Sequence, residues 1–70
     1  MPSMNDVYFA DNLLELPQSD KAEWKEKARS IVALPDSELD GLFAALLIFD
    51  PQAWRSAAAN LICKHREAKD

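Results

Sequence analysis

Cys63 and His65 have the side chains best suited to bind a metal or attack a substrate, and they stand two positions apart. A structural zinc site needs three or four ligands, but the sequence contains one cysteine and one histidine. A nucleophilic Cys–His pair needs both side chains within hydrogen-bond reach, whereas side chains two positions apart on a helix point in divergent directions. We therefore expect no metal site and no nucleophilic catalysis from this pair.

Asp36, Glu38 and Asp40 form a close group of carboxylates. Paired carboxylates act as general acids and bases when they converge in a cleft, and a chain of 70 residues leaves little room for one. Carboxylates are also frequent in the first turn of a helix, where they complement the helix dipole. A phosphate-binding loop needs several glycines, and Gly41 is the one glycine present. The sequence therefore indicates a protein that is not an enzyme and binds no cofactor.

The composition is that of a small globular protein, with 49% hydrophobic and 29% charged residues. A single cysteine excludes an internal disulfide and favours a reducing compartment. The longest apolar run, Leu42 to Phe49, is too short to cross a membrane. The first residues lack the basic start and apolar run of a secretion signal. We therefore expect a cytoplasmic protein that does not enter a membrane.

Helices are the only regular elements that the sequence predicts. No stretch alternates apolar and polar residues long enough for a convincing strand, and a single glycine leaves no tight hairpin turns. Prolines instead separate segments of helical periodicity. We expect one all-α domain of four short helices near residues 5–15, 20–33, 36–49 and 51–66, with residues 67–70 as a frayed tail.

Residues that favour helix starts stand at or next to the beginning of each of these segments. The candidate N-caps are Asn5 or Asp6, Asp20, Asp36 and Asp50. Glu23 has the capping-box spacing from Asp20, and Leu34 and Leu39 have the spacing of a hydrophobic staple around the start of the third helix. Pro51 follows Asp50 at the first helical position, where its missing N–H does no harm.

The helical periodicity also predicts the core. Its expected leading members are Phe9, Leu13, Trp24, Ile31, Leu39, Phe43, Leu46, Trp54 and Leu61. On the fourth helix, Ala59 and Cys63 lie opposite the stripe of Trp54 and Leu61. We expect this weakly polar side to face the solvent.

The third helix is apolar around most of its circumference. Gly41, Ala45 and Ile48 fall opposite its expected core side. Either the other three helices surround this helix, or its second face contacts another chain. We expect a two-fold homodimer that uses these three residues, since symmetric dimers are the commonest oligomers.

The charge distribution indicates the kind of partner. Eight basic and twelve acidic residues give a net charge of −4, and residues 1–50 hold four basic against ten acidic residues, a balance of −6. The electrostatic field of this negative charge attracts basic protein surfaces and repels the phosphates of nucleic acids. We therefore expect a protein-binding module, acting as a regulator, inhibitor or assembly factor, whose Asp36, Glu38 and Asp40 flank an apolar patch as an interface rim does.

A helix-turn-helix DNA-binding regulator is the alternative, with residues 38–65 as the motif and the helix from residue 51 as the recognition helix. It would expose Gln52, Arg55, Ser56 and Asn60. Arg55 is the one base in the first two turns of that helix. Because phosphate contacts supply much of the affinity for DNA, this lack of bases makes nucleic acid the less favoured partner.

Overall fold

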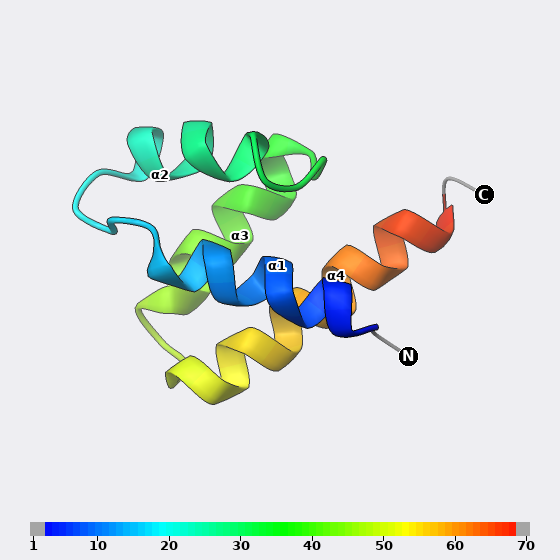
Figure 1. Cartoon of the computed structure of the whole chain (residues 1–70). Helices are drawn as coiled ribbons and strands as arrows, with labels where there is room; N and C mark the ends of the chain where they lie inside the picture. The colour runs from blue at the N-terminus through cyan, green and yellow to red at the C-terminus, as the bar shows by residue number, and fades with distance from the viewer. Residues whose placement is uncertain (1–2, 69–70) are drawn as a thin grey trace.

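The computed structural model describes residues 3–68. Four α-helices account for most of them: α1 (Met4–Glu15), α2 (Lys21–Arg29), α3 (Asp36–Leu46) and α4 (Pro51–Ala68) (Figure 1). No strand occurs in this part of the chain. The all-α class and the four-helix organisation predicted from the periodicity are therefore confirmed.

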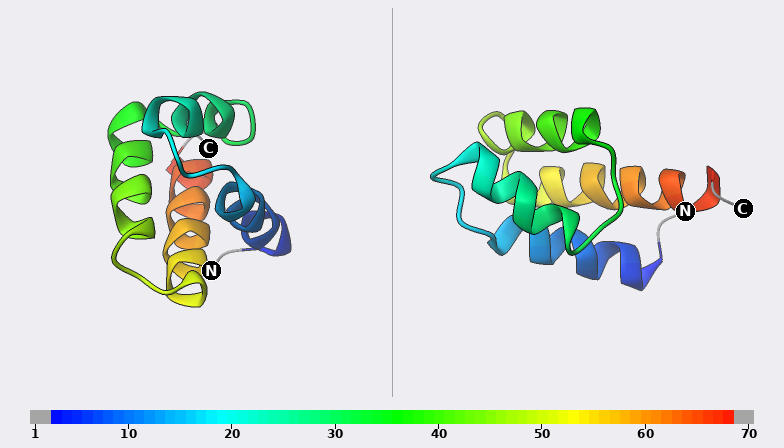
Figure 2. Two further views of the ribbon diagram at one scale, coloured as in Figure 1. Left: turned by 90° about the vertical axis from the view of Figure 1, so that its left-hand side faces the viewer. Right: turned by 90° about the horizontal axis from the view of Figure 1, so that it is seen from above.

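The helices pack on one another in the order α1, α4, α3, α2, so that α4 and α3 each have two main neighbours. α1 lies along α4, α3 packs on α4, and α2 packs on α3 (Figure 2). The third helix is thus not surrounded by the other three, as one of the two interpretations required. The connections 16–20 and 47–50 lie at one end of the bundle, and the two termini lie at the other (Figures 1 and 2). We call the first of these the connection end.

Two tryptophans hold the core together. Trp24 and Trp54 have no exposed surface, and each indole N–H donates to a backbone carbonyl of another helix, that of Leu13 at 3.2 Å and that of Leu42 at 2.8 Å. Burial of such a ring is favourable when its N–H finds an acceptor. Leu13 and Leu39 are buried as predicted, while the other expected members, Phe9, Ile31, Phe43, Leu46 and Leu61, are half-buried against the same cluster.

One face of α4 was predicted wrongly. Ala59 and Cys63 are 1% and 5% exposed, although we expected them to face the solvent. Arg55 and Arg66 of this helix pair with Asp11 and Asp6 of α1. Their spacing places Ala59 and Cys63 on the side facing α1. Small side chains there allow the two helices to pack closely, which the stripe of Trp54 and Leu61 did not indicate.

Two helices end earlier than predicted. α2 stops at Arg29 rather than near residue 33, and tight turn bonds such as Ile31 N–H to Ala28 O follow it. Pro35 favours an extended conformation of the residue before it, which does not continue a helix. The non-helical connection from residue 30 to residue 35 places the side chains of Val32 and Leu34 in the core. α3 stops at Leu46 rather than near residue 49.

The helix starts follow the predicted chemistry in part. Asp20 and Asp50 accept backbone N–H bonds at the starts of α2 and α4 as predicted. The cap of α1 is Ser3 rather than Asn5 or Asp6, because Ser3 and Asp6 form a reciprocal capping box. α3 begins after Pro35 without a side-chain cap, so Asp36 is its first residue rather than its cap.

Candidate functional site

Three consecutive large apolar residues project into solvent between α3 and α4. Leu47, Ile48 and Phe49 are 79%, 76% and 49% exposed. Their backbone N–H groups bond back to the carbonyls of Ala44 and Ala45, so the backbone forms a tight turn and the side chains stand outside it. We call residues 47–49 the apolar turn. Adjacent exposed apolar side chains of this size are typical of interaction sites.

The connection end that carries the apolar turn is also acidic. Glu15 ends α1, and Asp20 and Asp50 begin α2 and α4. In the described part of the chain none of these three carboxylates has an ion-pair partner. Two helix N-termini and two C-termini meet at this end, so the partial charges of their dipoles largely cancel. The negative charge of the three carboxylates therefore remains.

The carboxylates predicted to form the interface rim lie elsewhere and are paired within the chain. Arg29 donates to Asp36 at 2.6 Å, and Lys25 reaches Asp40 at 2.9 Å. Hydrogen bonding from Lys25, followed by that from Lys21, lowers the pKa of Asp40 below its ordinary value. These pairs join α2 to α3 and match the charges of the two aspartates, so these aspartates contribute little to a free acidic surface.

The residues predicted for a two-fold dimer do not share one exposed face. Gly41 is exposed, with open space beside its Cα, whereas Ala45 is half-buried against the core. Ile48 lies beyond the end of α3, in the apolar turn. The solvent side of α3 instead runs from Gly41 through Ala44 to that turn. Dimerisation through Gly41, Ala45 and Ile48 stays a prediction.

Cys63 and His65 stand two positions apart on α4, where side chains point in divergent directions. The Nε2 atom of His65 lies 3.9 Å from a carboxylate oxygen of Glu38, the third predicted rim residue. The buried Cys63 thiol lies 3.5 Å from a carboxylate oxygen of Glu67 and 3.6 Å from a guanidinium nitrogen of Arg66. Within residues 3–68 no three histidine, cysteine or acidic side chains gather as a metal site requires.

Sequence reasoning missed a buried carboxylate that joins the two ends of the described chain. Asp6 is 1% exposed; its carboxylate accepts the backbone N–H of Ser3 at 2.8 Å and a guanidinium N–H of Arg66 at 2.9 Å. The bond from the Ser3 backbone is the largest influence that lowers its pKa, with Arg66 adding to it against the effect of burial. No local pattern pairs residues 60 positions apart, so this contact needed the packing of α1 on α4.

On the surface proposed for DNA recognition, the one basic residue in the first two turns of α4 is paired within the chain. Gln52, Ser56 and Asn60 are exposed on α4, as the helix-turn-helix alternative required. Arg55, however, forms an ion pair with Asp11 of α1. Its positive charge is therefore already matched within the chain, and this arrangement does not favour phosphate binding.

Comparisons of the chain with protein family models, with curated proteins and with solved structures give no match. Among residues 3–68, none of the helices combines the length and the apolar character that crossing a membrane demands.

Proposed function

We propose that this protein is a binding module that occupies a basic surface of a partner protein through its connection end, as a regulator, inhibitor or assembly factor without catalysis of its own. The observation that carries this proposal is the exposure of the apolar turn, above all of Leu47 and Ile48 at 79% and 76%. Burying these side chains against a partner would remove a large apolar area from water, which favours association.

The carboxylates around the apolar turn define the chemistry of the partner. An interface commonly has an apolar centre and a polar rim, and Glu15, Asp20 and Asp50 are the acidic residues of the connection end. The complementary surface is an apolar patch with lysines or arginines beside it. Charges of this kind mainly accelerate association and sharpen specificity, and added salt screens them.

A capture experiment with paired variants tests this proposal. Tagged protein is incubated with extract of its source cells, and the retained proteins are compared with those held by the double variant Leu47→Ser, Ile48→Ser. We expect the double variant to retain less than a tenth of the partner, since loss of central apolar contacts typically costs more than about 1.4 kcal/mol of binding.

The matched control removes two exposed apolar side chains at the opposite end of α1. Met4 and Tyr8 are 89% and 63% exposed, and Met4→Ser, Tyr8→Ser should retain the partner. A charge variant, Glu15→Gln, Asp20→Ser, Asp50→Ser, keeps good N-cap residues and should weaken capture mainly at low salt. Capture that survives the turn variant but is lost with the α1 variant contradicts the proposed surface, and retention of nucleic acid rather than protein favours the alternative function.

A further inference from the structure

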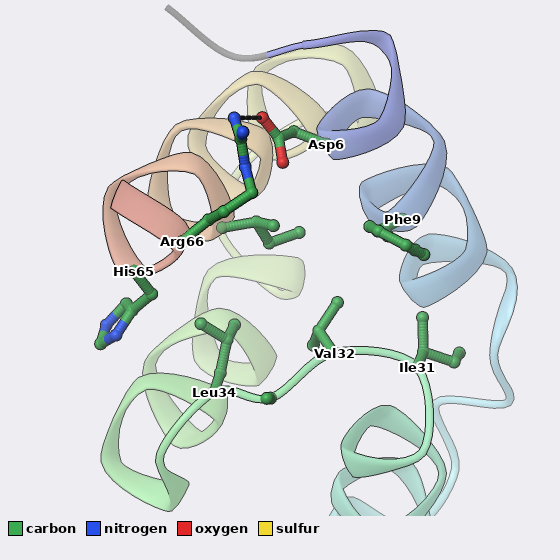
Figure 3. Close-up of a pocket in the computed structure, with 9 residues that line it drawn as sticks. Asp6, Phe9, Ile31, Val32, Leu34, His65 and Arg66 are labelled. Carbon is green, nitrogen blue, oxygen red and sulfur yellow. Dashed lines mark hydrogen bonds and ion pairs between the residues drawn. The ribbon is translucent and has the colours of Figure 1, made fainter. Parts of the chain in front are cut away.

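A small apolar pocket opens between α1, the connection 30–35 and α4, away from the connection end (Figure 3). Its volume is about 200 Å³, and its walls are the side chains of Phe9, Ile31, Val32, Ala33, Leu34 and Ile62. In Figure 3 the ring of Phe9 and the side chains of Ile31, Val32 and Leu34 surround the hollow. An apolar cavity of about 150 Å³ is large enough to bind benzene, so this pocket has room for one aromatic ring.

The polar residues that line the pocket are Asp6, His65 and Arg66, and the His65 ring points away from the hollow (Figure 3). Asp6 and Arg66 stand at its edge, joined by their 2.9 Å bond (Figure 3). The Asp6 side chain is 2% exposed, whereas that of Arg66 is 53% exposed. The bonds of Arg66 to Asp6 and to Cys63 both use one terminal nitrogen, Nη2, and a guanidinium carries five N–H donors. A polar group at the rim therefore meets N–H donors rather than a free carboxylate.

We propose that this pocket binds a small aromatic carboxylate, with the ring among Phe9, Val32 and Leu34 and the carboxylate at Arg66. This is a ligand site separate from the protein-binding surface above. The volume of the pocket accommodates one aromatic ring. The exposed N–H donors of Arg66 favour a ligand with a hydrogen-bond acceptor, and an anionic acceptor forms the strongest such bond. The negative charge of Asp6 weakens the attraction of Arg66 for an anion. It does not abolish that attraction, because the Asp6 carboxylate is buried at the positive N-terminal end of α1, whereas the guanidinium is half-exposed and has further N–H donors.

Titration of isotope-labelled protein with benzoate, followed by amide shifts in NMR spectra, tests the proposal. We expect saturable shifts around residues 31–34 and 62–66, with a dissociation constant in the millimolar range or below. Benzamide, which keeps the ring but not the charge, should bind about tenfold more weakly, as should benzoate to Arg66→Gln. Benzylamine should leave these amides unshifted.

A variant that fills the pocket from its exposed edge keeps the test independent of Arg66. Ala33→Trp places a large ring at the mouth and should abolish the benzoate shifts, while Ala22→Trp, at another exposed alanine outside the pocket, should not. Circular dichroism of each variant verifies that it is folded. The proposal is overturned if benzoate gives no saturable shift, if benzylamine binds equally well, or if folded Ala33→Trp binds benzoate as the unmodified protein does.

Discussion

Replacing Trp54 by alanine is expected to remove most of the stability of the protein. The side chain is fully buried and its indole N–H donates to Leu42. Truncation of a buried tryptophan costs about 3–5 kcal/mol of unfolding free energy, and a domain of this length has about 4–10 kcal/mol in total. Chemical denaturation followed by circular dichroism measures the loss.

Trp54→Phe is the matched control for this prediction. It keeps an aromatic ring but loses the hydrogen bond to Leu42, so we expect a smaller loss of about 1–3 kcal/mol. A loss below about 1 kcal/mol in Trp54→Ala would mean that the indole does not occupy the core, and the packing of α3 on α4 would then be wrong.

Asp6→Ala is expected to have the second largest effect on stability. It removes the capping box with Ser3 and the bond from Arg66, for an expected loss of about 1–3 kcal/mol near neutral pH. The exposed guanidinium of Arg66 remains hydrated, which limits the cost of leaving it unpaired. Urea denaturation of the variant and of Glu15→Gln, a control at an exposed carboxylate, measures the difference.

Asp6 is also expected to make the stability of the protein fall as the pH is lowered. The pKa of Asp6 is lowered on folding from its ordinary value of 3.8, so the unfolded chain binds a proton at a higher pH than the folded one. Its stabilising contribution is complete above the unfolded value and disappears as the pH falls through the folded value. Asp6→Asn should therefore lose less stability between pH 7 and pH 3 than the unmodified protein loses. Equal losses would contradict the assigned ionisation of Asp6.

The local signals in the sequence predicted the elements well and their contacts poorly. Asp20 and Asp50 mark helix starts because capping depends on a few neighbouring residues. The burial of Ala59 and Cys63 escaped prediction because it depends on α1, which is more than 40 residues away in the chain. Likewise, the pairing of Asp36 with Arg29 depends on how α2 folds back on α3, which periodicity does not specify.

The residues of the candidate surface could likewise be predicted only in part. Ile48 was singled out from its position on an apolar helix, and it is exposed. Its neighbour Leu47 was not singled out, because the expected helix continued to residue 49 and its actual end at Leu46 turns both side chains outward. Glu15 and Asp20 became candidates only when the packing placed connections 16–20 and 47–50 at one end (Figure 1).

Site-specific photocrosslinking tests the central claim, that the apolar turn contacts a partner protein, most directly. A photoreactive phenylalanine analogue is placed at position 48 in one sample and at position 8, an exposed site on α1, in another. Both samples are irradiated with the captured partner. We predict a covalent adduct with the partner from position 48 and none from position 8. An adduct from position 8 alone, or none from either position while the partner remains bound, would contradict the claim.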